Sequence, residues 1–587
     1  MRIFPVMIIL LSISFSAHAS EDSTSNKKAP NWIQQSNRIA DEYSIELGQL
    51  YPEVASHNGY KQFDSEVMSV VDDIETRQAD FLTKWQKKLN ILLKKTTDSN
   101  LHDDLQVMIN FVEGGIRYNH LQQKYGFIPF EEPAQVILGS LMDLLGPQAT
   151  QEQKLAAQVR LQKYVHGFKN YKPLVVAYES RIRFVAGKPS PRMKFYPAKE
   201  SIETYLKNSD STVEAVKTLL KGSGLVGWEQ DFALLQSQIS NYNAFIKSAV
   251  LPLGRTDYKI PEEMYANRLK ANGVDVSPQE LIRLGLQDYK NLYLEFNQLL
   301  KTVAQNNSLS SSDPQTVFSF LRTKVVKDQK SVQALYQKVS DDITAIIKQN
   351  DLVTVPDDPV LFSFASAEVS KAMPIPYLLP PRLIGNTGEK PLFIIPTTDT
   401  GDFAYDDFAY EAAAYDLFAH EGRPGHDLQF RSILESGVST IRATYAFNST
   451  NVEGWALYSE MMMYPYATLE AKLVILQMRL LRIARMFLEP QLELGATNTN
   501  EISKKLFVEL GFTEKWAQLE AWRYSSLTGQ ATSYQFGYKK ILKIKEEVRK
   551  AVGAKFTEKC FNDRYLKVGL LPIDLIGERL KSSLKCK

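Results

Sequence analysis

Apolar residues recur every three or four positions along most of the chain, which is the pattern of amphipathic helices. A clear example is formed by Phe81, Trp85, Leu89 and Leu92. The same periodicity predicts a mostly helical region from residue 32 to about residue 247. We therefore expect the first part of the protein to be a set of packed helices.

Two later helices have recognisable start signals. Ser277 fits the N-cap of a helix, Pro278 its first position, and Glu280 the reciprocal acid of a capping box. Asp313-Pro314 opens another helix after a polar loop. These signals predict that helices continue into the second half of the chain.

The pattern changes between about residues 352 and 402. Two short β-rich stretches, 375–384 and 392–396, are interrupted by Pro and Gly. Helical periodicity then returns over 403–421, 452–463 and 471–488. The sequence thus predicts a mainly α protein with one small β element before its second set of helices.

Composition narrows the functional classes. The chain has 587 residues, and its 69 Lys+Arg and 67 Asp+Glu give a formal charge of +2. Such a balance provides no overall field to attract polyanions, so no nucleic-acid partner is expected. The lysine-rich run at 539–545 is typical of a solvated helix face. Only 2 cysteines are present, which excludes a disulfide-rich scaffold and a cysteine-based zinc finger.

The N-terminus has the features of a signal peptide. Arg2 precedes an apolar run over 6–15, and Ala17-His18-Ala19 is a small-x-small cleavage signal. Residues 1–19 are therefore predicted to be removed, with 20–30 as a flexible lead-in; a membrane anchor is the alternative. We expect an exported protein, periplasmic or secreted, without stable membrane insertion after cleavage. No cysteine lies at the cleavage point to carry a lipid anchor.

Export bears on the two cysteines, Cys560 and Cys586. Both lie near the C-terminus, where an oxidising compartment would let them form a disulfide.

The main chemical signal is a pair of histidines in the run FAHEGRPGHDLQ, residues 418–429. His420, Glu421 and His426 follow the pattern of zinc hydrolases, in which two imidazoles bind the metal and a neighbouring Glu accepts a proton from water. Six residues separate the histidines, so an unbroken helix would point their rings about 120° apart. Pro424 and Gly425 predict a break that brings His426 back towards His420. The alternative is two helix-end histidines that bind no metal.

A catalytic zinc needs a third protein ligand, and no histidine follows His426. Glu453 and Glu460 lie seven residues apart in a helical stretch, on one face but about 10 Å apart along it. Glu453 is the favoured ligand, whereas Glu460 would not touch the metal but would hold one of its ligands in place. An ordinary amphipathic helix with exposed acids is the alternative.

Three blocks in order resemble the bacterial family known as domain of unknown function 885. They are HEGRPGHDLQ, then EGWALYSE, then Arg523-Tyr524 followed by GQATSYQFG at 529–537. A looser similarity reaches back to about Leu251. Two positions differ from many members: Asp427 stands where a second His is common, and Thr528 where a Pro is common.

Members of this family resemble gluzincin-type metallopeptidases, which have a mostly helical fold around a deep cleft. The resemblance implies Zn²⁺ bound by His420, His426 and Glu453, with Glu421 as general base. It also implies that Tyr534 or Arg523 stabilises the oxyanion or holds a substrate carboxylate. A tyrosine hydroxyl and an arginine guanidinium both suit a site where negative charge develops. The alternative is that this Tyr and Arg only hold helix ends together.

The function expected from these observations is an exported zinc peptidase acting on a peptide substrate. Two alternatives remain: a metal-dependent hydrolase of another amide or an ester, and a non-catalytic metal-containing binding protein. We expect an N-terminal helical region at 31–250 and a catalytic region at 251–587, which together form one compact unit. The β element would lie next to the cleft and offer an edge to an extended peptide.

Overall fold

The computed structural model describes residues 30–583 apart from 147–148, 188–193, 366–368, 371–374, 382, 384–385, 387 and 398–407. The predicted signal peptide, most of the lead-in after it, and Cys586 lie outside the described residues. The described part consists mainly of helices with a small sheet, which confirms the predicted mainly α class. None of its helices combines the length and hydropathy that crossing a bilayer requires.

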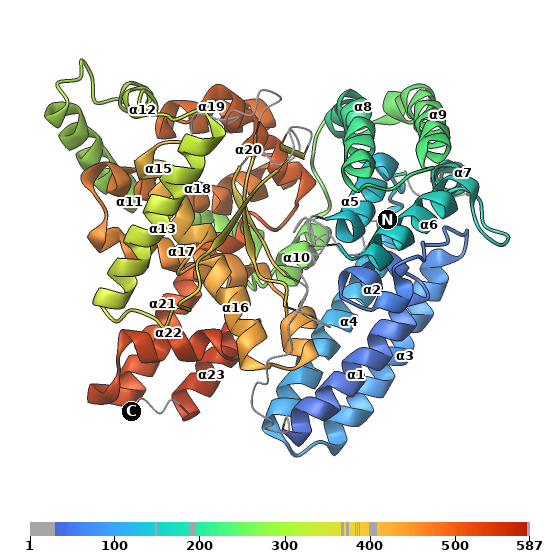
Figure 1. The fold of residues 1–587 in the computed structure, drawn as a ribbon, viewed down its shortest axis with the longest axis horizontal. Coiled ribbons are helices and arrows are strands. Elements are labelled where there is room, and N and C mark those ends of the chain that lie inside the picture. The colour runs from blue at the N-terminus through green and yellow to red at the C-terminus, as the bar shows by residue number, and fades with distance from the viewer. Residues whose placement is uncertain are drawn as a thin grey trace. The chain divides into compact units, whose positions relative to one another are not determined.

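Contacts within the chain separate it into two units. Unit 1 runs to Asp257 and also contains Leu379–Lys390 and Ser439–Ala446. Its helices are α1 (Asn31–Gly48), α2 (Pro52–His57), α3 (Ile74–Lys95), α4 (Ser99–Tyr125), α5 (Pro133–Leu145), α6 (Gln151–His166), α7 (Leu174–Gly187), α8 (Lys199–Gly222) and α9 (Glu229–Phe245). The long helices α3 and α4 pack side by side (Figure 1). The predicted helical region is thereby confirmed.

A buried carboxylate ties the segment Ser439–Ala446 into unit 1. Asp104 on α4 accepts hydrogen bonds from the hydroxyls of Ser36 and Ser439, each at 2.6 Å, and from Nε of Arg442 at 2.7 Å. A buried charge is costly unless it is paired and hydrogen-bonded, and these donors offset that cost. A short segment from late in the chain is thus held by an early helix.

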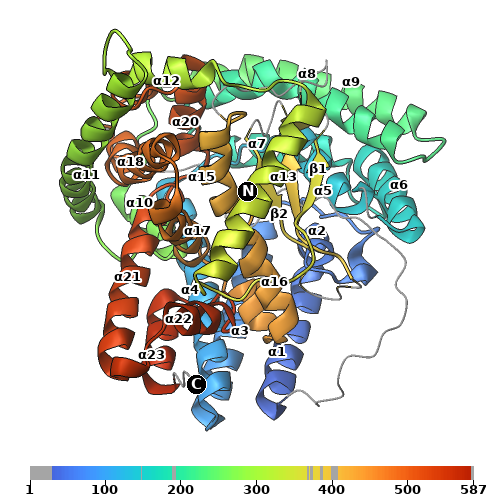
Figure 2. The ribbon, with the colours of Figure 1, turned by 60° about the vertical axis from the view of Figure 1, so that its left-hand side comes forward.

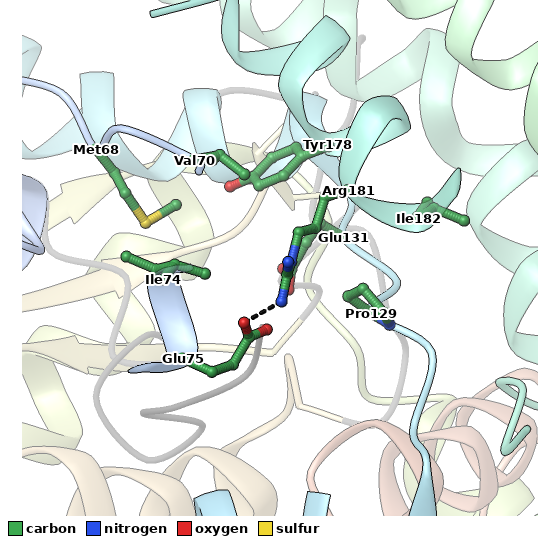
Figure 3. A pocket seen from close by; sticks show the side chains of 9 residues that line it. All are labelled: Met68, Val70, Ile74, Glu75, Pro129, Glu131, Tyr178, Arg181 and Ile182. Carbon is green, nitrogen blue, oxygen red and sulfur yellow. Dashed lines mark ion pairs between the residues drawn. The ribbon is translucent and has the colours of Figure 1, made fainter. Parts of the chain in front are cut away.

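Unit 1 contains a small pocket, drawn in Figure 3. Met68, Ile74 and Tyr178 belong to its largely apolar lining. Arg181 in its wall forms an ion pair with Glu75 and donates a hydrogen bond to a backbone carbonyl at 2.7 Å. Its positive charge is therefore balanced within the protein, and we assign no ligand to this pocket.

Unit 2 comprises Tyr258–Leu378, Pro391–Val438 and the chain from Phe447 onward. Its helices are α10 (Glu262–Ala271), α11 (Pro278–Asn306), α12 (Pro314–Arg322), α13 (Gln329–Gln349), α15 (Glu411–Glu421), α16 (His426–Ser436), α17 (Ser449–Met463), α18 (Leu469–Glu493), α19 (Thr499–Leu510), α20 (Glu514–Ser526), α21 (Ser533–Val552), α22 (Glu558–Leu566) and α23 (Ile573–Ser583). Helix α18 is buried along nearly all of its length and packs against α11, α15, α17 and α21 (Figure 2). It forms the core of this unit.

A three-stranded sheet packs on the helix that carries His420. Its strands β1 (Leu361–Phe364), β2 (Tyr377–Leu379) and β3 (Leu392–Ile395) lie in the order β1-β3-β2, with β1 and β3 parallel. The ring of Phe393 on β3 stacks on Phe418 of α15 with centroids 5.7 Å apart. The sheet therefore supports α15 from the side.

Several boundaries refine the predictions. Strands β2 and β3 fall in the two predicted stretches, whereas β1 was not predicted, and α15 begins at Glu411. Ser277 caps α11 as predicted. The carboxylate of Glu280, however, pairs with Arg283 at 2.6 Å. Glu280 was predicted to complete a capping box with Ser277, but its carboxylate pairs with Arg283 in the first turns of the helix instead.

Candidate metal centre

A tight turn between α15 and α16 brings the two histidines together. Helix α15 ends at Glu421 and α16 begins at His426, and the imidazole centroids lie 4.9 Å apart with an interplanar angle of 85°. A Cβ on Gly425 would lie 1.8 Å from the backbone oxygen of His420, so only glycine fits there. The predicted helix break is confirmed.

Buried hydrogen bonds hold this turn in place. The Arg423 guanidinium donates to the Asp427 carboxylate at 2.9 Å. The indole N–H of Trp455, on α17, donates to the backbone oxygen of Pro424 at 3.0 Å. Asp427 also lies 3.4 Å from Arg431. The aspartate that replaces the family's second His is therefore an ion-pairing residue of the turn.

Helix α17 places Glu453 against both imidazoles. Oε2 of Glu453 lies 3.5 Å from Nε2 of His420 and 3.5 Å from Nε2 of His426. Ligands about 2.0–2.1 Å from a tetrahedral zinc lie roughly 3.4 Å from one another. Among the described residues, neither this oxygen nor Nδ1 of His426 has a hydrogen-bond partner, although both are buried. The donor set and these spacings fit a bound zinc ion.

Glu421 faces the same space from the end of α15. Its Oε1 lies 3.8 Å from Nε2 of His420, and its Oε2 accepts a hydrogen bond from the backbone N–H of Leu378 on β2 at 2.9 Å. Distances alone also allow a ligand group of His420, Glu421 and His426, whose nearest atoms lie within 4.8 Å of one another. We favour Glu453 as the third ligand because its orphaned oxygen is close to both imidazoles.

His420 is oriented from behind by Glu460. Its Nδ1 lies 2.6 Å from Oε1 of Glu460, which also accepts from Arg482 on α18 at 3.2 Å. A carboxylate behind a ligating histidine fixes its tautomer and ring orientation. The seven-residue spacing in α17 thus separates the two roles: Glu453 faces the imidazoles, and Glu460 supports one of them.

The electrostatics of the cluster favour a cation. Burial lowers the pKa of His420, but contacts with Glu453 and Glu460 outweigh it and raise that pKa to about 10. Burial raises the pKa of Glu453, yet the two imidazoles bring it well below its usual value. A positive charge between these carboxylates is stabilised, as a divalent cation would be.

The third sequence block supplies a polar group beside the histidines. The ring of Tyr534 stacks on that of His420 with centroids 6.2 Å apart. Nη2 of Arg523 donates to the Tyr534 hydroxyl at 2.8 Å and to Oε1 of Gln530 at 2.6 Å. The structure therefore brings all six predicted site residues into one neighbourhood: His420, Glu421, His426, Glu453, Arg523 and Tyr534.

Two glycines allow the helices that carry Glu453 and Tyr534 to touch. A Cβ on Gly454 of α17 would lie 2.7 Å from the backbone carbon of Gly537 on α21. A Cβ on Gly537 would lie 2.0 Å from the backbone oxygen of Thr450. This backbone-to-backbone crossing sets the spacing between the second and third blocks.

The sequence reasoning missed the charged residues of α18. Arg482, Arg485, Glu489 and Glu493 are buried in a helix whose other residues are mostly apolar. Arg485 forms two hydrogen bonds to Glu520, at 2.6 and 3.0 Å, and its guanidinium lies 4.5 Å from the Tyr534 ring centroid. The sequence does carry a pattern for this buried charge. Spacings of three, four and four residues put the four charged side chains on one face of an otherwise apolar helix.

Glu489 yields a prediction about stability. Burial raises its pKa from 4.5 to about 8, against hydrogen bonds from Gly529 and Tyr265 that lower it. The pKa of Glu489 is higher in the folded state than in the unfolded state. Its favourable contribution to the free energy of unfolding is therefore complete below pH 4.5 and is lost as the pH rises through 8. At 1.36 kcal/mol per pKa unit this loss approaches about 4–5 kcal/mol.

In Glu489→Gln this dependence is removed. The Tm of the variant relative to wild type is expected to rise steadily between pH 5 and pH 8, measured by thermal unfolding in matched buffers. A difference in Tm that is constant over this range would contradict the expectation. Glu547→Gln is a suitable control, because Glu547 is exposed and paired with Lys581 at the surface.

Comparisons with known proteins agree with this mainly helical fold. The model of the family described as "Bacterial protein of unknown function (DUF885)" matches residues 52–580. The chain belongs to this family. No curated protein matches it.

Two solved structures are similar in fold. One is a proposed lipoprotein of unknown function from Shewanella oneidensis, with 18% identity, a TM-score of 0.69, and coverage of 94% of this chain and 99% of that one. The other is a proposed lipoprotein from Colwellia psychrerythraea, with 18% identity, a TM-score of 0.71, and coverage of 95% and 100%. At this identity the similarity establishes the fold alone.

Proposed function

We propose that the protein is an exported zinc-dependent peptidase. The observation that carries this proposal is the buried Oε2 of Glu453, which accepts no hydrogen bond from the described residues and lies 3.5 Å from Nε2 of both His420 and His426. Glu421, which metal binding does not require, lies beside this group and favours catalysis over simple metal storage. The resemblance of the motif to gluzincin-type metallopeptidases supports the same conclusion.

His420, His426 and Glu453 would hold the zinc ion. Zinc bound by such ligands lowers the pKa of a coordinated water and polarises a substrate carbonyl. Glu421 accepts the proton of the attacking water and passes it to the leaving amine. Its carboxylate is held for this role by the Leu378 N–H.

The neighbouring groups suit the remaining needs of peptide hydrolysis. Tyr534 and Arg523 offer an O–H and N–H groups where negative charge develops on the substrate. Strand β2 is at one end of the strand order, and we expect an extended peptide to lie beside it with its scissile bond near Glu421. Glu421 and Arg523 are partly exposed, with side-chain exposures of 15% and 25%.

The lysine-rich part of α21 does not favour a nucleic-acid function. Lys539 pairs with Asp288 at 2.8 Å, and Lys540 with Asp574 at 2.7 Å. Their charges are balanced by neighbouring carboxylates. The exported location is supported by the signal-peptide pattern, and the two structural neighbours are described as lipoproteins.

Chelation is the first test of the proposal. We expect about one zinc per chain, hydrolysis of a peptide library, loss of that hydrolysis with a zinc chelator, and its return when zinc is restored. Mass spectrometry of the products gives the cleavage position. Turnover of esters with no peptide cleaved would favour a different hydrolase, and bound zinc without any turnover would favour a binding protein.

A further inference from the structure

We propose that Gln530 is a positioning residue that aims Glu453 at the metal position and joins it to Arg523 and Tyr534; this inference rests on the proposed metal site. Gln530 follows Gly529 in the turn before α21, and its side chain reaches across to α17. Its Nε2 donates to Oε1 of Glu453 at 3.2 Å. The other oxygen of Glu453 then faces the imidazoles.

The chemistry of the neighbours fixes which way the Gln530 amide points. A guanidinium can only donate, so Nη2 of Arg523, 2.6 Å away, must meet the amide oxygen. The amide nitrogen is thereby directed to Glu453, whose carboxylate can only accept when ionised. A single side chain thus satisfies one group that can only donate and another that can only accept.

Two serines reinforce this orientation. The Ser533 hydroxyl donates to the backbone oxygen of Gln530 at 2.6 Å, which uses its only proton. Ser449, 2.6 Å from Ser533, must therefore donate to that hydroxyl. Ser449 is left as an acceptor for Nε2 of Gln530 at 3.1 Å. The two amide protons of Gln530 are thereby placed on Glu453 and Ser449.

The same arrangement prepares the Tyr534 hydroxyl. Its oxygen accepts a hydrogen bond at 2.8 Å from Nη2 of Arg523, the same nitrogen that donates to Oε1 of Gln530. A phenolic oxygen that accepts from a guanidinium keeps its own proton for another partner. Gln530 therefore connects, through Arg523, the carboxylate that faces the metal position with the hydroxyl that would meet substrate.

Gln530→Met tests this role, because Met has a similar volume and lacks both the donor and the acceptor. We expect zinc affinity, measured by competition with a chelator, to fall by about 10- to 100-fold, the usual cost of losing a partner behind a metal ligand. Gln535→Met is the control: Gln535 is a buried glutamine in the first turns of α21, and its amide donates to Asp288 at 3.2 Å instead of to Glu453. Its zinc affinity is expected to match wild type.

A second variant guards against misfolding. Gln530→Asn keeps a polar amide but is one methylene shorter, so it cannot span Glu453 and Arg523, and a similar loss of zinc affinity is expected at an unchanged Tm. Zinc affinity within about threefold of wild type in both Gln530 variants would overturn the proposal. Wild-type protein that binds zinc but cleaves nothing would refute the peptidase function alone, whereas wild-type protein without zinc would refute both.

Discussion

Glutamine in place of Glu421 is expected to remove peptide hydrolysis while the protein continues to bind zinc. The amide keeps the size of the side chain and can still accept the Leu378 N–H, but it cannot take a proton from water. General acid–base catalysis contributes about 10²- to 10⁴-fold, so kcat should fall by that factor. Steady-state kinetics and the metal content of the purified variant measure the two properties separately.

Glu453→Gln provides the contrast. We expect this variant to lose zinc as well as activity, because the oxygen 3.5 Å from both Nε2 atoms becomes part of a neutral amide. If Glu421→Gln were instead the variant that loses zinc, the third ligand would be Glu421, in the alternative group with His420 and His426. Equal metal content in all variants would contradict both assignments.

Much of this site could be predicted because its residues lie in short runs with local rules. Pro424 and Gly425 indicated that the helix breaks, and a break is what brings His426 to His420. The separation of Glu453 and Glu460 by seven residues indicated that one metal could not take both. Local backbone chemistry and helix geometry were sufficient for these conclusions.

Other features depend on contacts between distant parts of the chain. The Leu378 N–H that holds Glu421 comes from another element, 43 residues away. No local pattern marks one backbone N–H as the partner of a given carboxylate. The place of Gln530 between Glu453 and Arg523 also follows only from how α17 meets the turn before α21. Such contacts become visible only when the packing is known.

The charged face of α18 is an intermediate case. We missed this face, although the spacing of Arg482, Arg485 and Glu489 in an apolar helix is a sign of buried charge. The spacing could not have identified their partners, because Glu460 and Glu520 come from two other helices. Sequence patterns therefore locate buried charge more readily than they pair it.

Gly537→Ala is the second change with a large expected effect, and here helix propensity and packing predict opposite signs. Gly537 lies inside α21, where alanine is intrinsically better by about 1 kcal/mol. A Cβ at this position, however, would lie 2.0 Å from the backbone oxygen of Thr450 on α17, and backbone cannot move aside as a flexible side chain can. We expect packing to win, with a loss of about 1–3 kcal/mol in the free energy of unfolding.

The same substitution should weaken zinc binding, since separating α21 from α17 moves Gln530 away from Glu453. Gly114→Ala is the matched control, because Gly114 also lies inside a helix, α4, but has open space where the Cβ would be. That variant should be as stable as wild type or slightly more so. Denaturant unfolding and chelator competition on both variants test the argument. If Gly537→Ala gained stability like the control and bound zinc normally, the crossing of α17 and α21 would not set the geometry of the site.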